Sequence, residues 1–131
     1  MATGFTRREA TEILQEVVKG SYVALSTTTP DQDGNNFTEP AYSTGYLQAP
    51  FGDLDTSILG QVSNAKTIFL FEATKDIGSV TYAGLEKSGI GICLMVKLSS
   101  ALPITAGYVP LIRRHGFVIG LDKDELEAYP D

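Results

Sequence analysis

The sequence predicts a mainly β protein: an antiparallel β-sandwich or jelly-roll-like domain with one N-terminal amphipathic α-helix. Two observations lead to this prediction. Helical periodicity is confined to residues 6–19, and the chain beyond it alternates short β-prone runs with turn signals, for which 13 glycines and 6 prolines are available. No helical pattern lies between those runs, as it would in parallel βαβ units.

The 131 residues are expected to form a single domain. A chain of this size buries roughly two-thirds of its unfolded surface and needs no disulfide or metal to fold. We divide it into a helix (6–19), a β-sandwich (21–121) and an acidic C-terminal tail (122–131), which holds five acidic side chains and one lysine.

The helix is predicted from its two ends and from its apolar stripe. Thr6 and Glu9 form a capping box, and Gly20 stands where a glycine commonly ends a helix. Apolar residues recur between them at intervals of three and four: Ala10, Ile13, Leu14, Val17 and Val18. This stripe is expected to cover an open face of the β-structure or to lie on a neighbouring subunit.

Residues 22–27 are β-prone, with Val23 and Leu25 on one face and Tyr22 and Ala24 on the other, which predicts an interior strand. The next stretch, 28–44, shows no periodicity and is punctuated by prolines and by Asp, Gly and Asn. An irregular segment of this length in a compact domain is more often functional than idle. We therefore expect this loop to contact a neighbouring subunit or an external partner.

Further strand segments are expected to build the sandwich: 46–51, 66–72, 79–83, 90–98, 102–104, 108–112 and 116–121. Residues 66–72 contain an unbroken apolar run, which predicts a strand buried on both faces. In the segment 90–98, apolar side chains occupy alternate positions from Ile90 to Leu98. This face is expected to form the broadest wall of the core.

The charge and hydropathy patterns exclude several classes of partner. The net charge of −6 argues against nucleic acid, because binding to phosphates draws on lysine and arginine. No apolar stretch approaches the ~20 residues that span a bilayer, so membrane insertion is not expected. Cys93 is the only cysteine and cannot form an internal disulfide, which favours a reducing cytosol as the place of folding.

Asp31, Asp33 and Asn35 occupy alternate positions, as the first ligands of a calcium loop do. The EF-hand pattern requires glycine at its sixth position and glutamate at its twelfth, whereas here Gly34 is fourth and Glu39 is ninth. The stretch is therefore interpreted as a polar turn in which Asp and Asn bond to their own backbone. No metal and no cofactor are predicted.

His115 is the only histidine, and it follows Arg113 and Arg114 directly. A Ser-His-Asp device would require this histidine in a pocket beside a serine or an aspartate. No nucleophile motif such as G-x-S-x-G is present. His115 is therefore interpreted as part of a basic surface turn, and the chain as non-enzymatic.

Two arginine pairs and the polar loop contain the residues that are predicted to contact partners. The arginines are the main concentrations of positive charge on an acidic chain and suit acidic surfaces of neighbouring subunits. The predicted contact residues are Arg7, Arg8, Asp31, Asp33, Asn35, Asn36, Arg113 and Arg114.

Several short motifs follow one another along the chain: Tyr22–Pro30 (YVALSTTTP), Asp33-Gly34, Thr38-Glu39-Pro40, Gly45-Tyr46, Asn64, Ile68–Thr74 (IFLFEAT) and Gly78–Leu85 (GSVTYAGL). In this order and with these gaps, the chain resembles a family of small bacteriophage virion proteins that are often labelled tail fibre proteins. The similarity covers most of the chain after the helix.

The resemblance implies a non-enzymatic bacteriophage virion structural protein, used as a capsid decoration or fibre-associated module on the exterior of the particle. It would be assembled in the cytoplasm of the host bacterium and located in the virion. Its partners would be other phage structural proteins of the capsid or tail, and copies on a symmetric particle favour a closed homo-oligomer, with a trimer expected. The alternative function is a receptor- or glycan-binding knob at the tail tip or baseplate.

Overall fold

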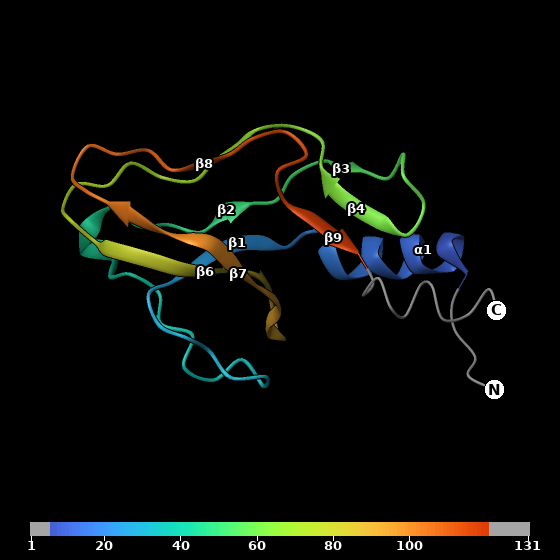
Figure 1. Ribbon diagram of the computed structural model, residues 1–131, viewed down its shortest axis with the longest axis horizontal. Helices are drawn as coiled ribbons and strands as arrows, with labels where there is room; N and C mark the ends of the chain where they lie inside the picture. The colour runs from blue at the N-terminus through green and yellow to red at the C-terminus, as the bar shows by residue number, and fades with distance from the viewer. Residues whose placement is uncertain (1–5, 121–131) are drawn as a thin grey trace.

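The computed structural model describes residues 6–120. In these residues one helix, α1 (Arg7–Val18), precedes a series of strands (Figure 1). The strands are β1 (Tyr22–Ser26), β2 (Ala49–Pro50), β3 (Leu54–Asp55), β4 (Gln61–Asn64), β5 (Ile68–Phe69), β6 (Gly78–Lys87), β7 (Gly91–Ile104), β8 (Leu111–Ile112) and β9 (Val118–Gly120). A short 3₁₀ helix, η1 (Tyr42–Thr44), lies between β1 and β2. The predicted tail, 122–131, lies outside the described residues.

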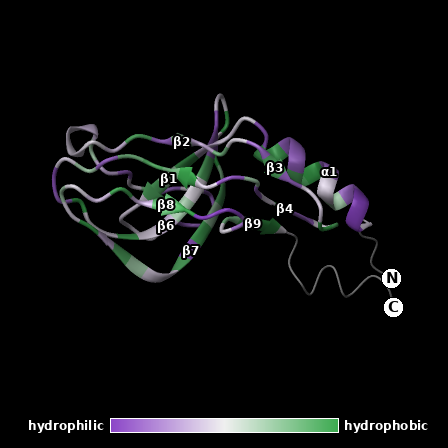
Figure 2. Ribbon diagram, turned by 90° about the horizontal axis from the view of Figure 1, so that it is seen from above, coloured by the Kyte–Doolittle hydropathy of each residue, from purple (hydrophilic) through white to green (hydrophobic). Residues whose placement is uncertain are grey.

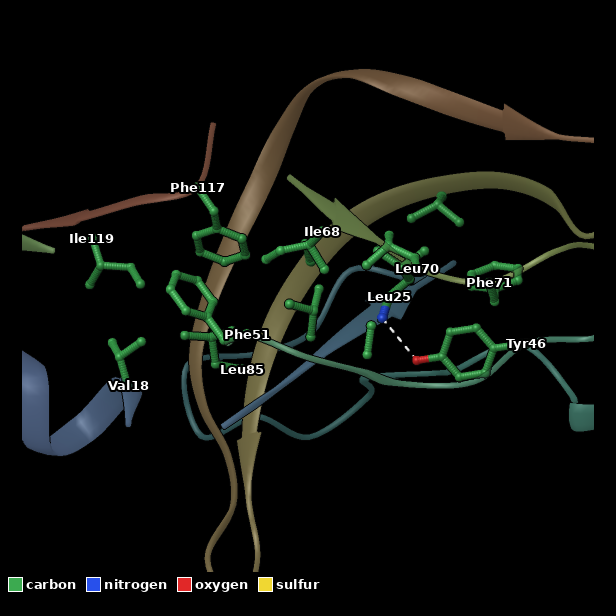
Figure 3. Packing of buried hydrophobic residues seen from close by; sticks show 14 of the residues in the cluster. Val18, Leu25, Tyr46, Phe51, Ile68, Leu70, Phe71, Leu85, Phe117 and Ile119 are labelled. Carbon is green, nitrogen blue, oxygen red and sulfur yellow. Dashed lines mark hydrogen bonds between the residues drawn. The ribbon is translucent and has the colours of Figure 1, made fainter. Parts of the chain in front are cut away.

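The strands form three antiparallel sheets, with the orders β2-β1-β6-β7, β3-β4-β9 and β5-β8. The four-stranded sheet and the β5-β8 ribbon form two layers (Figure 1). Leu25 and Leu85 of the first layer lie in one hydrophobic core with Ile68 and Leu70 of the second (Figure 3). The predicted mainly β fold, a sandwich of antiparallel sheets with one N-terminal helix, is confirmed.

Local capping explains the ends of α1. The side chain of Thr6 accepts a hydrogen bond from the backbone N–H of Glu9 over 3.1 Å, as the capping box predicts. Gly20 follows the helix in the left-handed conformation, with φ 73°. The helix therefore lies within the expected range of residues 6–19.

The buried face of α1 differs from the predicted stripe. Ala10, Leu14 and Val18 are buried, but Thr11 is buried as well and Ile13 is exposed. The helix packs against β4 and β9 of its own domain, the first of the two positions expected for it. Its two faces, hydrophobic and hydrophilic, are visible in Figure 2.

The first strand has the predicted position. β1 lies between β2 and β6, and the side chains of Val23, Ala24 and Leu25 are all buried. β2 is shorter than the predicted segment 46–51. Pro50 is accommodated because β2 is an edge strand, where the missing N–H of proline is not needed.

The prediction that residues 66–72 form a strand buried on both faces is wrong. Only Ile68 and Phe69 are in a strand, β5, and the side chain of Phe69 is 67% exposed. The physical reason is that β5 belongs to a two-stranded ribbon that has the core on one face only. Ile68, Leu70 and Phe71 are buried in that core.

The prediction that the alternating face of residues 90–98 is the broadest wall of the core is also wrong. Ile90 lies in the turn before β7 and is 72% exposed, and Val96 is exposed as well. β7 is an edge strand, and its pairing with β6 is interrupted at two places. Thr81 alone lies opposite residues 98–101 of β7, and a second shift leaves Cys93 without a counterpart between Leu85 and Glu86. β7 therefore curves along the margin of the molecule, with hydrophobic residues over much of its length (Figure 2).

Candidate functional site

The polar loop between β1 and η1 is closed at its base and ordered at its tip. The N–H of Thr27 donates to the carbonyl oxygen of Thr38 (3.0 Å). At the tip, Oδ1 of Asp31 accepts from the N–H groups of Asp33 and Asn35, each over 2.9 Å. This arrangement is the polar turn inferred from the sequence, since the aspartate binds its own backbone. Gly34 takes the left-handed conformation that the turn requires, with φ 83°.

The loop lies on the outer surface of the β6-β7 hairpin. A Cβ atom on Gly84 would come within 3.0 Å of the Phe37 ring. The ring can pack against the backbone at this position because Gly84 has no side chain. Near the loop tip, Gly34 approaches Ile92 of β7. The loop is therefore packed against the sheet at two points.

A buried tyrosine joins the loop to the sandwich. The hydroxyl of Tyr46 donates to Oε1 of Glu39 (2.6 Å) and accepts from the N–H of Leu25 (3.0 Å; Figure 3). Gln48 Nε2 also donates to Oε1 of Glu39, over 2.7 Å. Burial, together with the hydrogen bond to Glu39, raises the pKa of Tyr46 far above its ordinary value, so the hydroxyl keeps its proton.

Asn64 holds the chain that leads into β9. Its Nδ2 donates to the carbonyl oxygens of Lys66 and Arg113, each over 2.8 Å, and its Oδ1 accepts from the N–H of Phe117 over 2.9 Å. The Asn64 side chain is fully buried. Because Asn64, Glu39, Tyr46 and Gly84 all belong to the motifs of the resemblance, those motifs maintain internal contacts of the fold.

The predicted contact residues lie in three separate places. Arg7 and Arg8 are exposed in the first turn of α1, at one end of the molecule (Figure 1). Arg113 and Arg114 are exposed in the turn between β8 and β9. The other predicted contact residues, Asp31, Asp33, Asn35 and Asn36, are in the loop on the β6-β7 hairpin. The structure does not bring the three sets into one site, and their contact with a partner stays a prediction.

His115 has neighbours that sequence reasoning missed. Its Nε2 lies 2.6 Å from Oδ2 of Asp55. Ser57, Gln61 and Ser63 line the same small pocket of about 100 Å³. The contact joins segments far apart in the sequence, and no local pattern around His115 or Asp55 indicated it.

The Asp55 carboxylate is the centre of this pocket. Hydrogen bonds from Ser57, including one of 2.9 Å from its N–H, and the contact with His115 lower the pKa of Asp55 to about 2. Ser57 and His115 thus both contact the same carboxylate. A hydrolase triad is built differently, as a chain in which serine bonds to histidine and histidine to aspartate. The pocket thus places His115 beside an aspartate and a serine, which is the surrounding that a Ser-His-Asp device requires, but Ser57 and His115 meet at the carboxylate of Asp55. In this arrangement the contacts join the β3 segment to the β8-β9 turn.

A larger open site lies along the edge of β7. A groove of about 410 Å³ separates β7 from the segment that contains β8 and the start of β9. Val96, Leu98 and Leu102 line it on the β7 side, and Leu111, Ile112 and Val118 contribute to the opposite side. Lys97 is the only charged residue that lines the groove within the part of the chain that the structure describes. Here the sandwich is not closed over its apolar interior.

Sequence reasoning missed this groove because the alternating hydrophobic pattern of a strand is the same whether the strand lies at the edge of a sheet or in its centre. A signal was nevertheless present in β7. Lys97 and Pro103 are residue types that are common in edge strands and uncommon in central ones.

Comparisons with known proteins give no relative for this chain. No family model, no curated protein and no solved structure matches it. Within residues 6–120, no group of three or more His, Cys, Asp or Glu side chains could hold a metal ion. In the same part of the chain, no helix is long and apolar enough to cross a membrane.

Proposed function

We propose that the protein is a non-enzymatic structural protein of a bacteriophage particle, a capsid decoration or fibre-associated module on the particle exterior. The observation that carries the proposal is the open apolar groove beside β7. Apolar surface rimmed by polar residues commonly marks a site of contact with another protein. The motif resemblance supplies the phage context.

The contacts of the motif residues support a structural role. Glu39 and Tyr46 bond to each other, and the polar atoms of Asn64 are occupied by three backbone groups. A residue that serves catalysis has to present a reactive atom to a substrate. These side chains instead fix loops and strand connections, as expected of a rigid module that is built into an assembly.

The proposed partners are other phage structural proteins, from the capsid or the tail, and further copies of this chain. A trimer is favoured as the closed assembly on a symmetric particle. The proposed location is the virion, after assembly in the cytoplasm of the host. Light scattering on the purified full chain tests the trimer, which predicts three times the mass of one chain; a monomer at all concentrations would contradict it.

Labelling of intact particles tests the proposed function. Antibodies against the purified protein are applied to particles from the infected cells that produce it, and preimmune antibodies serve as the control. Labels at regular positions on the head or tail in electron micrographs are expected. The presence of the protein in infected cells together with its absence from purified particles would contradict the proposal.

A receptor- or glycan-binding knob is the second candidate, and two exposed tyrosines favour it. Tyr42 is 74% exposed in η1, and Tyr108 is exposed in the connection before β8. Backbone hydrogen bonds of Ala73 to Tyr108 (3.0 Å) and of Thr74 to Thr44 (2.8 Å) place both tyrosine segments beside one stretch of chain. Exposed aromatic rings with a polar tip suit contacts that are partly wet.

Binding of the purified protein to host cells tests this second candidate. The double variant Tyr42→Ala/Tyr108→Ala is expected to lose cell binding, and Tyr22→Ala, which removes an exposed tyrosine of β1, is the matched control. Equal binding by the wild type and by the double variant would contradict a role for these rings.

A further inference from the structure

The backbone of β7 has an unused side. β7 has 14 residues, the most of any strand within residues 6–120, and it pairs with β6 alone. The N–H and C=O groups that point away from β6 have no strand to bind in this part of the structure. An exposed edge of this kind is a template on which an extended peptide can add as a further strand.

The groove beside this edge supplies apolar contacts for such a peptide. Val96 and Leu102 of β7 line it together with Leu111 and Val118. Val96 and Leu111 are each 44% exposed, and Val118 is 51% exposed, so the peptide would cover apolar surface that now meets water. In an added strand every second side chain points to the same face, so alternate apolar residues would enter the groove.

The charges around the groove define the chemistry of the peptide. Of the lining residues that lie within 6–120, Lys97 alone is charged, and its side chain is exposed. Arg113 and Arg114 are also exposed, and they lie between the lining residues Ile112 and Gly116. Among residues 6–120, no acidic residue lines the groove. The site therefore complements an acidic side chain.

We propose that the edge of β7 binds an extended segment of a different polypeptide as an added strand. The segment places alternate apolar side chains in the groove and an acidic side chain beside Lys97. This inference rests on the proposed function, because it assigns the docking surface of the module and the form of its partner.

A second copy of the chain fits this edge less well. Its β7 would bring another lysine and no acidic residue, and each copy carries a net charge of −6. The bulge at residues 98–101 also interrupts the edge. Two β7 strands related by a two-fold axis would place two such bulges in one pairing, whereas a short peptide meets a single one.

Selection from a displayed library of linear nonapeptides on the full-length protein tests the inference. Enriched peptides are expected to alternate apolar residues and to contain Asp or Glu. When they are titrated into the ¹⁵N-labelled protein, the largest amide shifts are expected in β7. N-methylation of alternate peptide amides is expected to abolish binding, because it blocks the strand hydrogen bonds while it retains the side chains.

Two charge reversals provide the matched comparison. Lys97→Glu is expected to weaken binding of the acidic peptides about fivefold, as for the loss of one partly exposed ion pair. Lys75→Glu is the control, because the Lys75 side chain is exposed, does not line the groove, and its reversal changes the net charge equally. Equal effects of the two variants would overturn the inference.

Three further results would overturn it. These are a failure to enrich any peptide, undiminished binding of the N-methylated peptides, and a dimer of the full chain held by contacts between two β7 strands. The particle-labelling experiment remains a separate measurement. If the protein is absent from particles while the peptide results hold, the proposed function fails and the strand-binding edge stands. If the protein is present on particles while the peptide results fail, the proposed function stands and the inference about β7 fails.

Discussion

Gly45 is a single position at which two distant segments meet. It has φ 89°, and a Cβ atom there would overlap the carbonyl oxygen of Glu72. In Gly45→Ala, the left-handed conformation and the overlap with the backbone act together, so the free energy of unfolding is expected to fall by about 3 kcal/mol. Urea denaturation followed by circular dichroism measures the change.

Gly52→Ala is the control for this prediction. Gly52 also has a positive φ, 78°, but no heavy atom lies within 4 Å of the Cβ position. Only the conformational term applies, and the expected loss is roughly 1 kcal/mol. Equal losses of unfolding free energy in the two variants would show that the close approach of Glu72 to Gly45 does not contribute to the effect of the substitution.

The free energy of unfolding is expected to depend on pH through Asp55. Its pKa lies at about 2 in the folded state, below the ordinary value of 3.8, because Ser57 and His115 bond to the carboxylate. A lowered folded-state pKa stabilises the protein above pH 3.8, and this stabilisation is lost as the pH falls through 2. The Asp55→Asn variant lacks this stabilisation at every pH. The wild type is therefore expected to be more stable than the variant at pH 4, and this difference is expected to become smaller as the pH falls to 2. A difference in urea midpoint that is constant with pH would contradict this assignment.

At the scale of elements, Thr11 joins α1 to the segment that leads into β4. Its hydroxyl donates to the carbonyl oxygen of Arg7 (2.8 Å) and accepts from the N–H of Gly60 (2.7 Å). Thr11→Val keeps the shape but leaves the Gly60 N–H buried without a partner, which is expected to cost about 1–3 kcal/mol. Thermal unfolding measures the loss. Thr67→Val, at an exposed position, is expected to change stability little.

The two ends of α1 were predictable from sequence, whereas its buried face was not. The capping contact between Thr6 and Glu9 is made within one turn, so the local sequence contains all of its partners. The burial of Thr11 depends on Gly60, which comes from the approach to β4. A hydrophobic stripe alone would exclude a threonine from the buried face and include Ile13.

The same distinction explains β7 and the His115 pocket. Alternation predicted a strand over residues 90–98, and most of that strand exists. Whether the apolar face of this strand is covered depends on how many strands and segments lie beside it in the fold. The local sequence pattern does not specify that arrangement. The contact between His115 and Asp55 likewise depends on how β9 pairs with β4 and β4 with β3. The candidate site was therefore the least predictable part of the molecule.

At the scale of the whole molecule, the structure separates the two arginine pairs that the sequence grouped together. Arg113 and Arg114 lie in the turn beside the groove, whereas Arg7 and Arg8 lie at the start of α1. Under the proposed function, the double variant Arg113→Glu/Arg114→Glu is expected to reduce binding to acidic surfaces of the particle by roughly tenfold, as for two partly exposed ion pairs. Cosedimentation with particles stripped of the protein measures this binding.

Arg7→Glu/Arg8→Glu is the matched control, because it changes the net charge equally at a site away from the groove. Its binding is expected to remain near that of the wild type at physiological salt, where charges far from the interface are screened. A larger loss in this control than in the Arg113/Arg114 variant would place the interface at the helix end.

The packing of α1 has a consequence for the way the chain opens. α1 has 12 residues, too few to be stable alone in water, and it rests on β4 and β9, which pair with each other. Release of β9 would uncover the helix, and loss of the helix would uncover both strands. The amide protons of α1, β4 and β9 are therefore expected to exchange with solvent at a common rate, as one cooperative unit that opens independently of β1 and β6.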